Sequence, residues 1–146
     1  MMASPDYFKI ENETVHLYKL QKSWGEGDGL GEEAKQGEAS WVSAKTKEVP
    51  WRKPGIWGDL EDSDTRIIMA SAYRIQRISE DQWIAFYFTS AGIADLKKLT
   101  TGNPDEGWWL KEEKENPNAV MTFYSSDDEF LENRPYLEVY YLPPNK

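Results

Sequence analysis

The run Val15-His16-Leu17-Tyr18-Lys19-Leu20, followed by Ser23-Trp24-Gly25-Glu26-Gly27, decides how this chain is interpreted. Residues of the first run alternate between two sets, and a period of two is typical of a β-strand. The two sets are Val15, Leu17 and Lys19 on one face and His16, Tyr18 and Leu20 on the other. The second run opens a stretch from Gly25 to Gly37 that contains five glycines and has no regular period, which predicts a long irregular loop.

Short apolar and aromatic runs separated by turn residues continue along the chain and predict further strands. We expect them at residues 7–10, 38–42, 66–74, 83–88, 107–111, 119–124 and 136–141. One helix is expected over residues 92–99, capped by Thr89 or Ser90 and ended by Gly102. Prolines and tryptophans at residues 49–59 indicate irregular structure, because proline is excluded from helix interiors and central strands.

Composition limits the classes of partner. The chain has 146 residues, a size that one domain can occupy, and we expect a single domain over residues 1–146. It carries 26 acidic and 17 basic residues, a net charge of −9, which disfavours a nucleic-acid partner. No apolar run is long enough to span a membrane, and the first residues lack the pattern of a signal peptide. The absence of cysteine excludes disulfides and thiol chemistry.

Aromatic residues are unusually frequent. Seven Trp, eight Tyr and five Phe make up 14% of the chain. Such side chains suit the pleated surface of a sheet, and their faces also stack on the apolar faces of sugar rings. The composition therefore favours β-structure and is compatible with carbohydrate binding.

The order of these motifs resembles the DNRLRE domain, which is related to the disaggregatase-type and alginate-binding carbohydrate-binding modules of microbial extracellular proteins. The resemblance extends from about Val15 to Tyr141. After the two opening runs, it is carried by Ala39-Ser40-Trp41, Pro50-Trp51, Gly58-Asp59, Phe86-Tyr87-Phe88-Thr89, Gly107-Trp108-Trp109-Leu110, Phe123-Tyr124-Ser125-Ser126 and Arg134-Pro135-Tyr136-Leu137-Glu138-Val139.

The resemblance implies an all-β, jelly-roll-like antiparallel β-sandwich with one short helix, no catalytic apparatus, and a location outside the cell or on its surface. The family's first strands have no counterpart before Tyr7. A sandwich without them leaves a sheet edge unpaired. We therefore expect the missing strands to come from a protein partner, from self-association or from another part of the same protein.

The candidate residues for carbohydrate binding are the later tryptophans and nearby cations. Trp108 and Trp109 are adjacent in a predicted strand, so their side chains point to opposite faces, and one of the two is expected to face outward. The predicted sugar-binding set is Trp57, Trp109, Arg52, Lys53 and Lys111, in which the cations would serve an acidic glycan. Trp24, Trp41 and Trp51 are interpreted as core or loop anchors.

Two acidic runs offer hard oxygen ligands for Ca²⁺. The first run, residues 59–64, supplies the candidate set for a structural calcium ion, which is Asp59, Asp62 and Asp64. The second run is Asp127-Asp128-Glu129. Neither run has EF-hand spacing, and acidic turns are usually only solvated. No cofactor is otherwise expected.

Three functions follow, in decreasing order of support. The first is a non-catalytic module that binds extracellular or cell-wall polysaccharide, and the second is an interaction domain of a cell-surface assembly completed by a partner chain. The third is a polysaccharide hydrolase or lyase using carboxylates such as Glu26 and Asp59. It has the least support, because the chain has no cysteine and its only histidine, His16, lies in a predicted strand without a nucleophile motif.

Overall fold

A computed structural model describes residues 13–28, 32–56, 60–75, 83–99, 101–102, 106–114 and 121–142 of the protein. The chain divides into two compact units, residues 9–116 and residues 117–146 together with 1–8.

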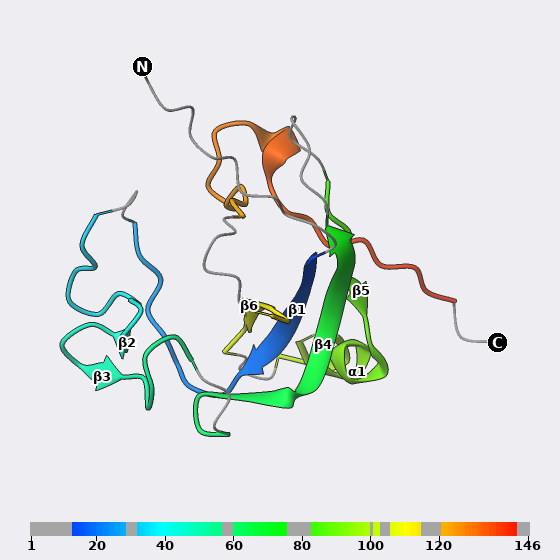
Figure 1. The fold of residues 1–146 in the computed structure, drawn as a ribbon. Coiled ribbons are helices and arrows are strands. Elements are labelled where there is room, and N and C mark those ends of the chain that lie inside the picture. The colour runs from blue at the N-terminus through cyan, green and yellow to red at the C-terminus, as the bar shows by residue number, and fades with distance from the viewer. Residues whose placement is uncertain are drawn as a thin grey trace, which may run out of the picture. The chain divides into compact units, whose positions relative to one another are not determined.

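The first unit is built on a four-stranded sheet with the order β5-β4-β1-β6 (Figure 1). Its strands are β1 (Glu13–Leu20), β4 (Ser63–Ile75), β5 (Tyr87–Phe88) and β6 (Trp108–Glu112). Every pairing in this sheet is antiparallel. The strands predicted at residues 66–74 and 107–111 are thereby confirmed.

The alternation predicted for β1 is also confirmed, and it separates the two neighbouring tryptophans of β6. Tyr18 pairs with Trp109, whereas Lys19 pairs with Trp108. Paired residues share a face of the sheet, so Trp108 and Trp109 project from opposite faces.

A small two-stranded sheet packs on the Trp109 face. It consists of β2 (Ser43–Lys45) and β3 (Val49–Pro50). Ala44 and Trp51 are buried in one cluster with Leu20 of β1, and Trp109 packs against this cluster. Pro50 is tolerated in β3 because both strands of a two-stranded sheet are edges.

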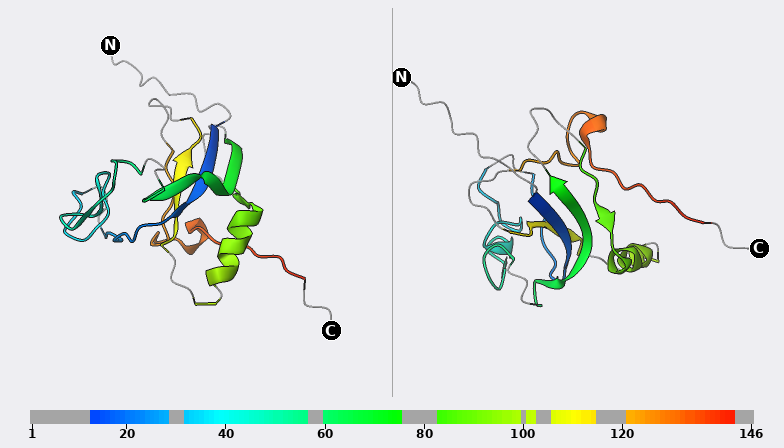
Figure 2. Two further views of the ribbon diagram at one scale, coloured as in Figure 1. Left: turned by 90° about the horizontal axis from the view of Figure 1, so that it is seen from below. Right: turned by 45° about the vertical axis from the view of Figure 1, so that its right-hand side comes forward.

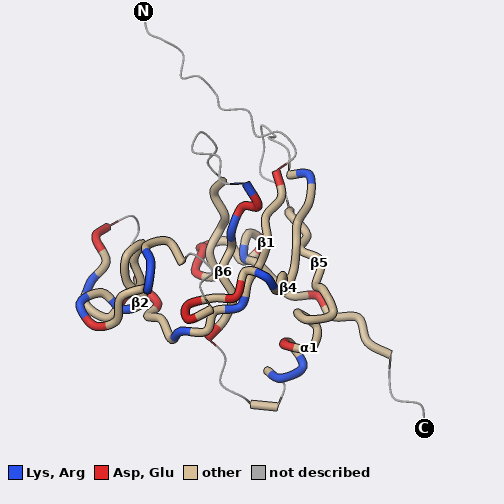
Figure 3. Tube along the Cα trace, turned by 60° about the horizontal axis from the view of Figure 1, so that its bottom comes forward, with Lys and Arg blue, Asp and Glu red and all other residues tan. Residues whose placement is uncertain are grey.

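Helix α1 (Ser90–Leu99) packs against β4 and β5, as Figure 2 shows. Its N-terminus is capped as predicted, because the backbone N–H of Gly92 donates to Thr89 Oγ1 at 3.2 Å. Lys97 and Lys98 occupy the last turn (Figure 3), where positive charge suits the helix dipole. Glycine at position 92 is required, since a Cβ there would lie 2.1 Å from the carbonyl oxygen of Met69.

Asp95 fastens α1 to the sheet. Its carboxylate is buried, pairs with the Lys19 ammonium at 2.8 Å and accepts a hydrogen bond of 2.9 Å from Trp108 Nε1. Burial by itself raises the pKa of Asp95, but the hydrogen bonds from Lys19 and Trp108 outweigh it, so the pKa lies below the ordinary value of 3.8.

Two strand predictions in this unit need correction. Residues 38–42 are not a strand, and the strand instead begins at Ser43. The strand predicted at 83–88 is reduced to Tyr87–Phe88, which pairs with Ser71 and Ala70. Continued pairing would place Ile84 opposite Arg74, but Arg74 has a φ of 56°, which turns the backbone of β4 away from the extended conformation.

In the second unit, residues 121–142 contain one regular element, the 3₁₀ helix η1 (Leu131–Asn133). The strand predicted at 136–141 is wrong, as is the described part of the strand predicted at 119–124. A strand needs a hydrogen-bonded neighbour, and apolar alternation alone does not supply one. The strand predicted at 7–10 lies outside the described residues.

The described part of the chain is therefore β-rich, with antiparallel sheets and one α-helix. Within it, no helix has the length and apolar character needed to cross a membrane.

We predict that Asp95→Asn lowers the free energy of unfolding by about 1–3 kcal/mol at neutral pH, the typical cost of losing charge-assisted hydrogen bonds. A carboxylate with a depressed folded-state pKa stabilises the fold above its unfolded pKa, and that contribution disappears as the pH falls through the folded pKa. The difference between wild type and variant, measured by urea unfolding, should therefore shrink below pH 3.8. The control is Asp127→Asn in an exposed turn, and a pH-independent difference for Asp95→Asn would contradict the prediction.

Candidate functional site

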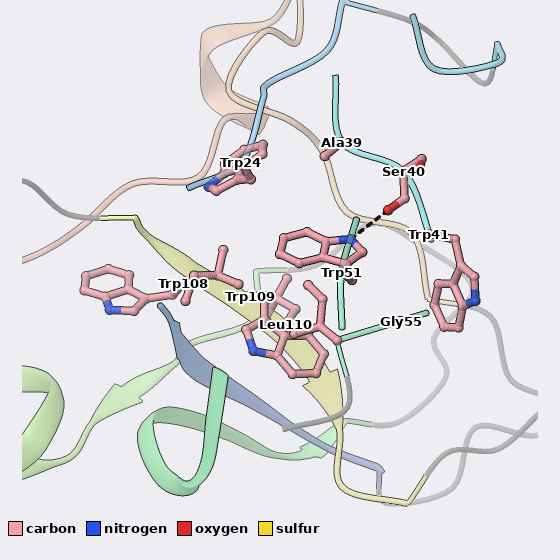
Figure 4. A pocket seen from close by; sticks show the side chains of 11 residues that line it. Trp24, Ala39, Ser40, Trp41, Trp51, Gly55, Trp108, Trp109 and Leu110 are labelled. Atoms are coloured by element: carbon pink, nitrogen blue, oxygen red, sulfur yellow. Dashed lines mark hydrogen bonds between the residues drawn. The ribbon is translucent and has the colours of Figure 1, made fainter. Parts of the chain in front are cut away.

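The first unit contains an open pocket of about 410 Å³ with mainly apolar walls (Figure 4). This volume is within the range of small-molecule sites, about 300–1,000 Å³. In Figure 4, Trp51 and Trp109 lie in the middle of the group, with Trp24 and Trp108 on one side and Trp41 on the other. The lining residues are Leu20, Trp24, Ala39, Ser40, Trp41, Trp51, Gly55, Ile56, Trp108, Trp109 and Leu110.

The pocket runs along the outer edge of β6. Three consecutive residues of this strand, Trp108, Trp109 and Leu110, line it. Consecutive side chains of a strand point to opposite faces, so they can share one pocket only where it passes round the edge of the sheet. β6 is the end strand of the described sheet, which makes this arrangement possible.

Hydrogen bonds hold four of the five indole rings in place. Trp24 Nε1 donates to the Glu106 carbonyl at 2.8 Å, and Trp51 Nε1 donates to the Ser40 carbonyl at 2.9 Å. Trp108 Nε1 donates to Asp95, and Trp109 Nε1 donates to Ser63 Oγ at 2.7 Å. Each ring is thus oriented by its own N–H, so the walls are preorganised.

Trp41 differs from the other four. Its side chain is 71% exposed, and its indole N–H has no hydrogen-bond partner within the described ranges. The ring lies against Gly55, where a Cβ would come within 2.5 Å of Trp41 Cζ2. Gly55 also has a φ of 77°, which favours glycine. Trp41 therefore offers a broad aromatic surface at the rim of the pocket.

Of the predicted sugar-binding residues, the structure places Trp109 in the pocket wall, and Trp57 lies outside the described residues. Arg52 and Lys53 are exposed and do not line the pocket, and the Arg52 guanidinium pairs with Glu61 at 2.7 Å. Lys111 Nζ lies 5.7 Å from the centroid of the Trp109 ring. The predicted cations are therefore not brought together at the pocket.

The three tryptophans interpreted as core or loop anchors differ in their burial. Trp51 is buried in the core, as predicted. Trp24 and Trp41 are exposed at the pocket, so neither is a core residue. Trp24 is held in its loop by the hydrogen bond to the Glu106 carbonyl, which agrees with its interpretation as a loop anchor. The expectation that Trp108 or Trp109 faces outward is not met, because both are half-buried and bonded internally. No periodicity in the sequence distinguishes these cases, since the pocket joins loops and strands distant along the chain.

The predicted calcium ligands have basic partners. The Asp62 side chain is buried, pairs with the Lys22 ammonium and accepts a hydrogen bond of 2.7 Å from the Arg52 backbone N–H. Both oxygens of Asp64 accept hydrogen bonds of 2.9 Å from the Arg66 guanidinium, which lowers the pKa of this carboxyl. No cluster of three or more metal-ligating side chains occurs among the residues described. Asp59 lies outside them, so structural calcium stays a prediction.

His16 is buried in the sheet, and its Nδ1 lies 2.8 Å from Ser71 Oγ, with which it forms a hydrogen bond. Ser71 is only 1% exposed, so no substrate reaches its hydroxyl in this arrangement. The pair instead connects β1 to β4, at a position where the two residues are also register partners. This contact supports the interpretation of His16 as an ordinary sheet residue.

Comparison of the chain with known protein families, with curated proteins and with solved structures found no match. The resemblance to the DNRLRE domain therefore depends on the sequence motifs alone.

We predict that Gly25→Ala destabilises the protein by about 1–3 kcal/mol, the typical cost of overpacking. A Cβ at Gly25 would lie 1.7 Å from the Gly37 carbonyl oxygen, and the backbone of Gly25 also bonds to Ala44 and Ala39. The matched control is Gly27→Ala, whose Cβ would meet nothing closer than 3.4 Å. Equal midpoints for the two variants in urea unfolding would contradict this prediction.

Proposed function

We propose that this chain is a non-catalytic module that binds extracellular or cell-wall polysaccharide. The observation that carries the proposal is the pocket lined by five tryptophans, four of them oriented by internal hydrogen bonds. Fixed aromatic rings bind the apolar C–H faces of sugars with little loss of side-chain entropy on binding.

The openness of the site fits this role. Trp41 presents a large exposed surface at the rim, so one sugar face can stack there while the hydroxyl groups of the other side stay in water. A polysaccharide is too long to be enclosed, and a pocket along a strand edge suits a chain that continues beyond the site at both ends.

The motif resemblance supports the same proposal independently of the pocket. On this basis we propose that the β-rich fold is a jelly-roll-like sandwich of the DNRLRE type, without catalytic apparatus and located outside the cell or on its surface. The structural calcium proposed at Asp59, Asp62 and Asp64 would belong to the same type of module.

The first test is affinity electrophoresis in gels that contain soluble polysaccharides. We expect retardation of the wild type by at least one polymer. Trp41→Ala should weaken binding roughly tenfold to a hundredfold, which corresponds to an aromatic stacking contact worth about 1.4–2.8 kcal/mol. Because Trp41 is largely exposed, this substitution should leave the circular-dichroism spectrum and the unfolding midpoint nearly unchanged.

The matched control is Trp83→Ala. Trp83 is 60% exposed but does not line the pocket. Loss of binding in both variants would indicate nonspecific adhesion of indoles, and absence of binding to every polymer would refute the proposed function.

A second candidate function is that of an interaction domain completed by another chain. The backbone N–H of Leu20 donates to Gly107, and that of Glu113 donates to Thr14. In an antiparallel pair the bonded positions alternate, so the N–H and C=O groups of Trp108 and Leu110 point away from β1. These backbone groups have no hydrogen-bond partner in the described part of the chain, and such groups can pair with a strand of a second copy.

This second candidate predicts concentration-dependent self-association of the wild type, measured by size-exclusion chromatography with light scattering. Leu110→Pro should remain monomeric, because proline removes an outward N–H and leaves the bonds to β1 in place. The control is Leu110→Ala, which keeps the N–H and should associate like the wild type. A wild type that is monomeric at all concentrations would argue against self-association through β6.

A further inference from the structure

We infer that the tryptophan pocket selects an uncharged stretch of glycan and rejects uronic-acid polymers. This inference rests on the proposed function and narrows it to one class of polysaccharide. It differs from the expectation that Arg52, Lys53 and Lys111 serve an acidic glycan.

The described walls of the pocket carry no charged side chain. Among the described residues that line the pocket, none has an ionisable side chain, and Ser40 supplies the only side-chain hydroxyl. A carboxylate moved from water against such walls would lose hydration without gaining a cation or a dense set of donors. An uncharged sugar face pays no such penalty.

Three of the cations near the pocket already have other contacts. The Arg52 guanidinium pairs with Glu61, and the Lys22 ammonium pairs with the buried Asp62. The Lys111 ammonium lies over the Trp109 ring. Using Arg52 or Lys22 for a ligand carboxylate would compete with an existing ion pair.

The net charge of the whole chain also disfavours an acidic glycan. With a net charge of −9, the protein repels a polyanion at long range. Figure 3 shows acidic and basic segments interspersed along the described chain.

The remaining polar groups at the pocket are neutral and suit hydroxyl groups. The Trp41 indole offers a donor, and the outward backbone groups of Trp108 and Leu110 offer both donors and acceptors at the strand edge. A sugar hydroxyl can donate and accept, so it matches this mixture. A carboxylate only accepts, so it can use the donors of this mixture but not the carbonyl groups.

The test uses the intact chain in affinity gels at low and high salt. The neutral probes are hydroxyethylcellulose, galactomannan and arabinoxylan, and the acidic probes are carboxymethylcellulose, alginate and polygalacturonate. Hydroxyethylcellulose and carboxymethylcellulose share a backbone and differ in the charge of the substituent, so they form a matched pair. Trp41→Ala and Trp83→Ala are run beside the wild type.

We expect at least one neutral polymer to bind at least tenfold more tightly than every acidic polymer. This binding should be nearly independent of salt and should be weakened in Trp41→Ala but not in Trp83→Ala. Tightest binding to an acidic polymer, weakened by salt, would overturn the selectivity and leave carbohydrate binding in place. Failure of all six polymers to bind would overturn both the selectivity and the proposed function.

Discussion

The hydrogen-bonded ladder between β1 and β6 is the constraint on which the rest of the first unit depends. Its register pairs Tyr18 with Trp109 and Lys19 with Trp108, so two adjacent indoles are assigned to opposite faces. Trp108 then reaches Asp95 of α1, and Trp109 reaches Ser63 and the cluster around Trp51. A shift of one residue would exchange the two faces and break both sets of contacts.

The walls of the pocket are mainly apolar, and internal hydrogen bonds use the N–H groups of four of its five indoles. An indole whose N–H is bonded internally presents mainly its apolar ring to a ligand. The internal bonds of Trp24 and Trp51 lead to backbone carbonyls of Glu106 and Ser40, so they depend on the path of the chain more than on neighbouring side chains. Gly25 and Gly55 allow this path, since a side chain at either position would collide with the backbone or with Trp41.

Charge is distributed differently in the pocket and in the rest of the molecule. The chain is strongly acidic, yet the described lining is uncharged, and nearby basic groups pair with carboxylates such as Asp62 and Glu61. Buried Asp62 needs a cation because its desolvation is otherwise unfavourable. The structure thus uses Lys22 to neutralise the buried Asp62 carboxylate.

The sequence by itself determined the elements whose signals are local. The alternation of residues 15–20 predicted β1, Thr89 and Gly102 predicted the ends of α1, and adjacency alone put Trp108 and Trp109 on opposite faces. The strand predicted at 83–88 was confirmed only at Tyr87–Phe88, and the one at 136–141 failed, because a strand forms only where another strand offers hydrogen bonds in register. Only the tertiary structure decided which indoles are buried, that Trp24 and Trp41 share a pocket with Trp109, and that Arg52 faces Glu61. These facts depend on which distant segments meet in space, and residue types along the chain do not encode that locally.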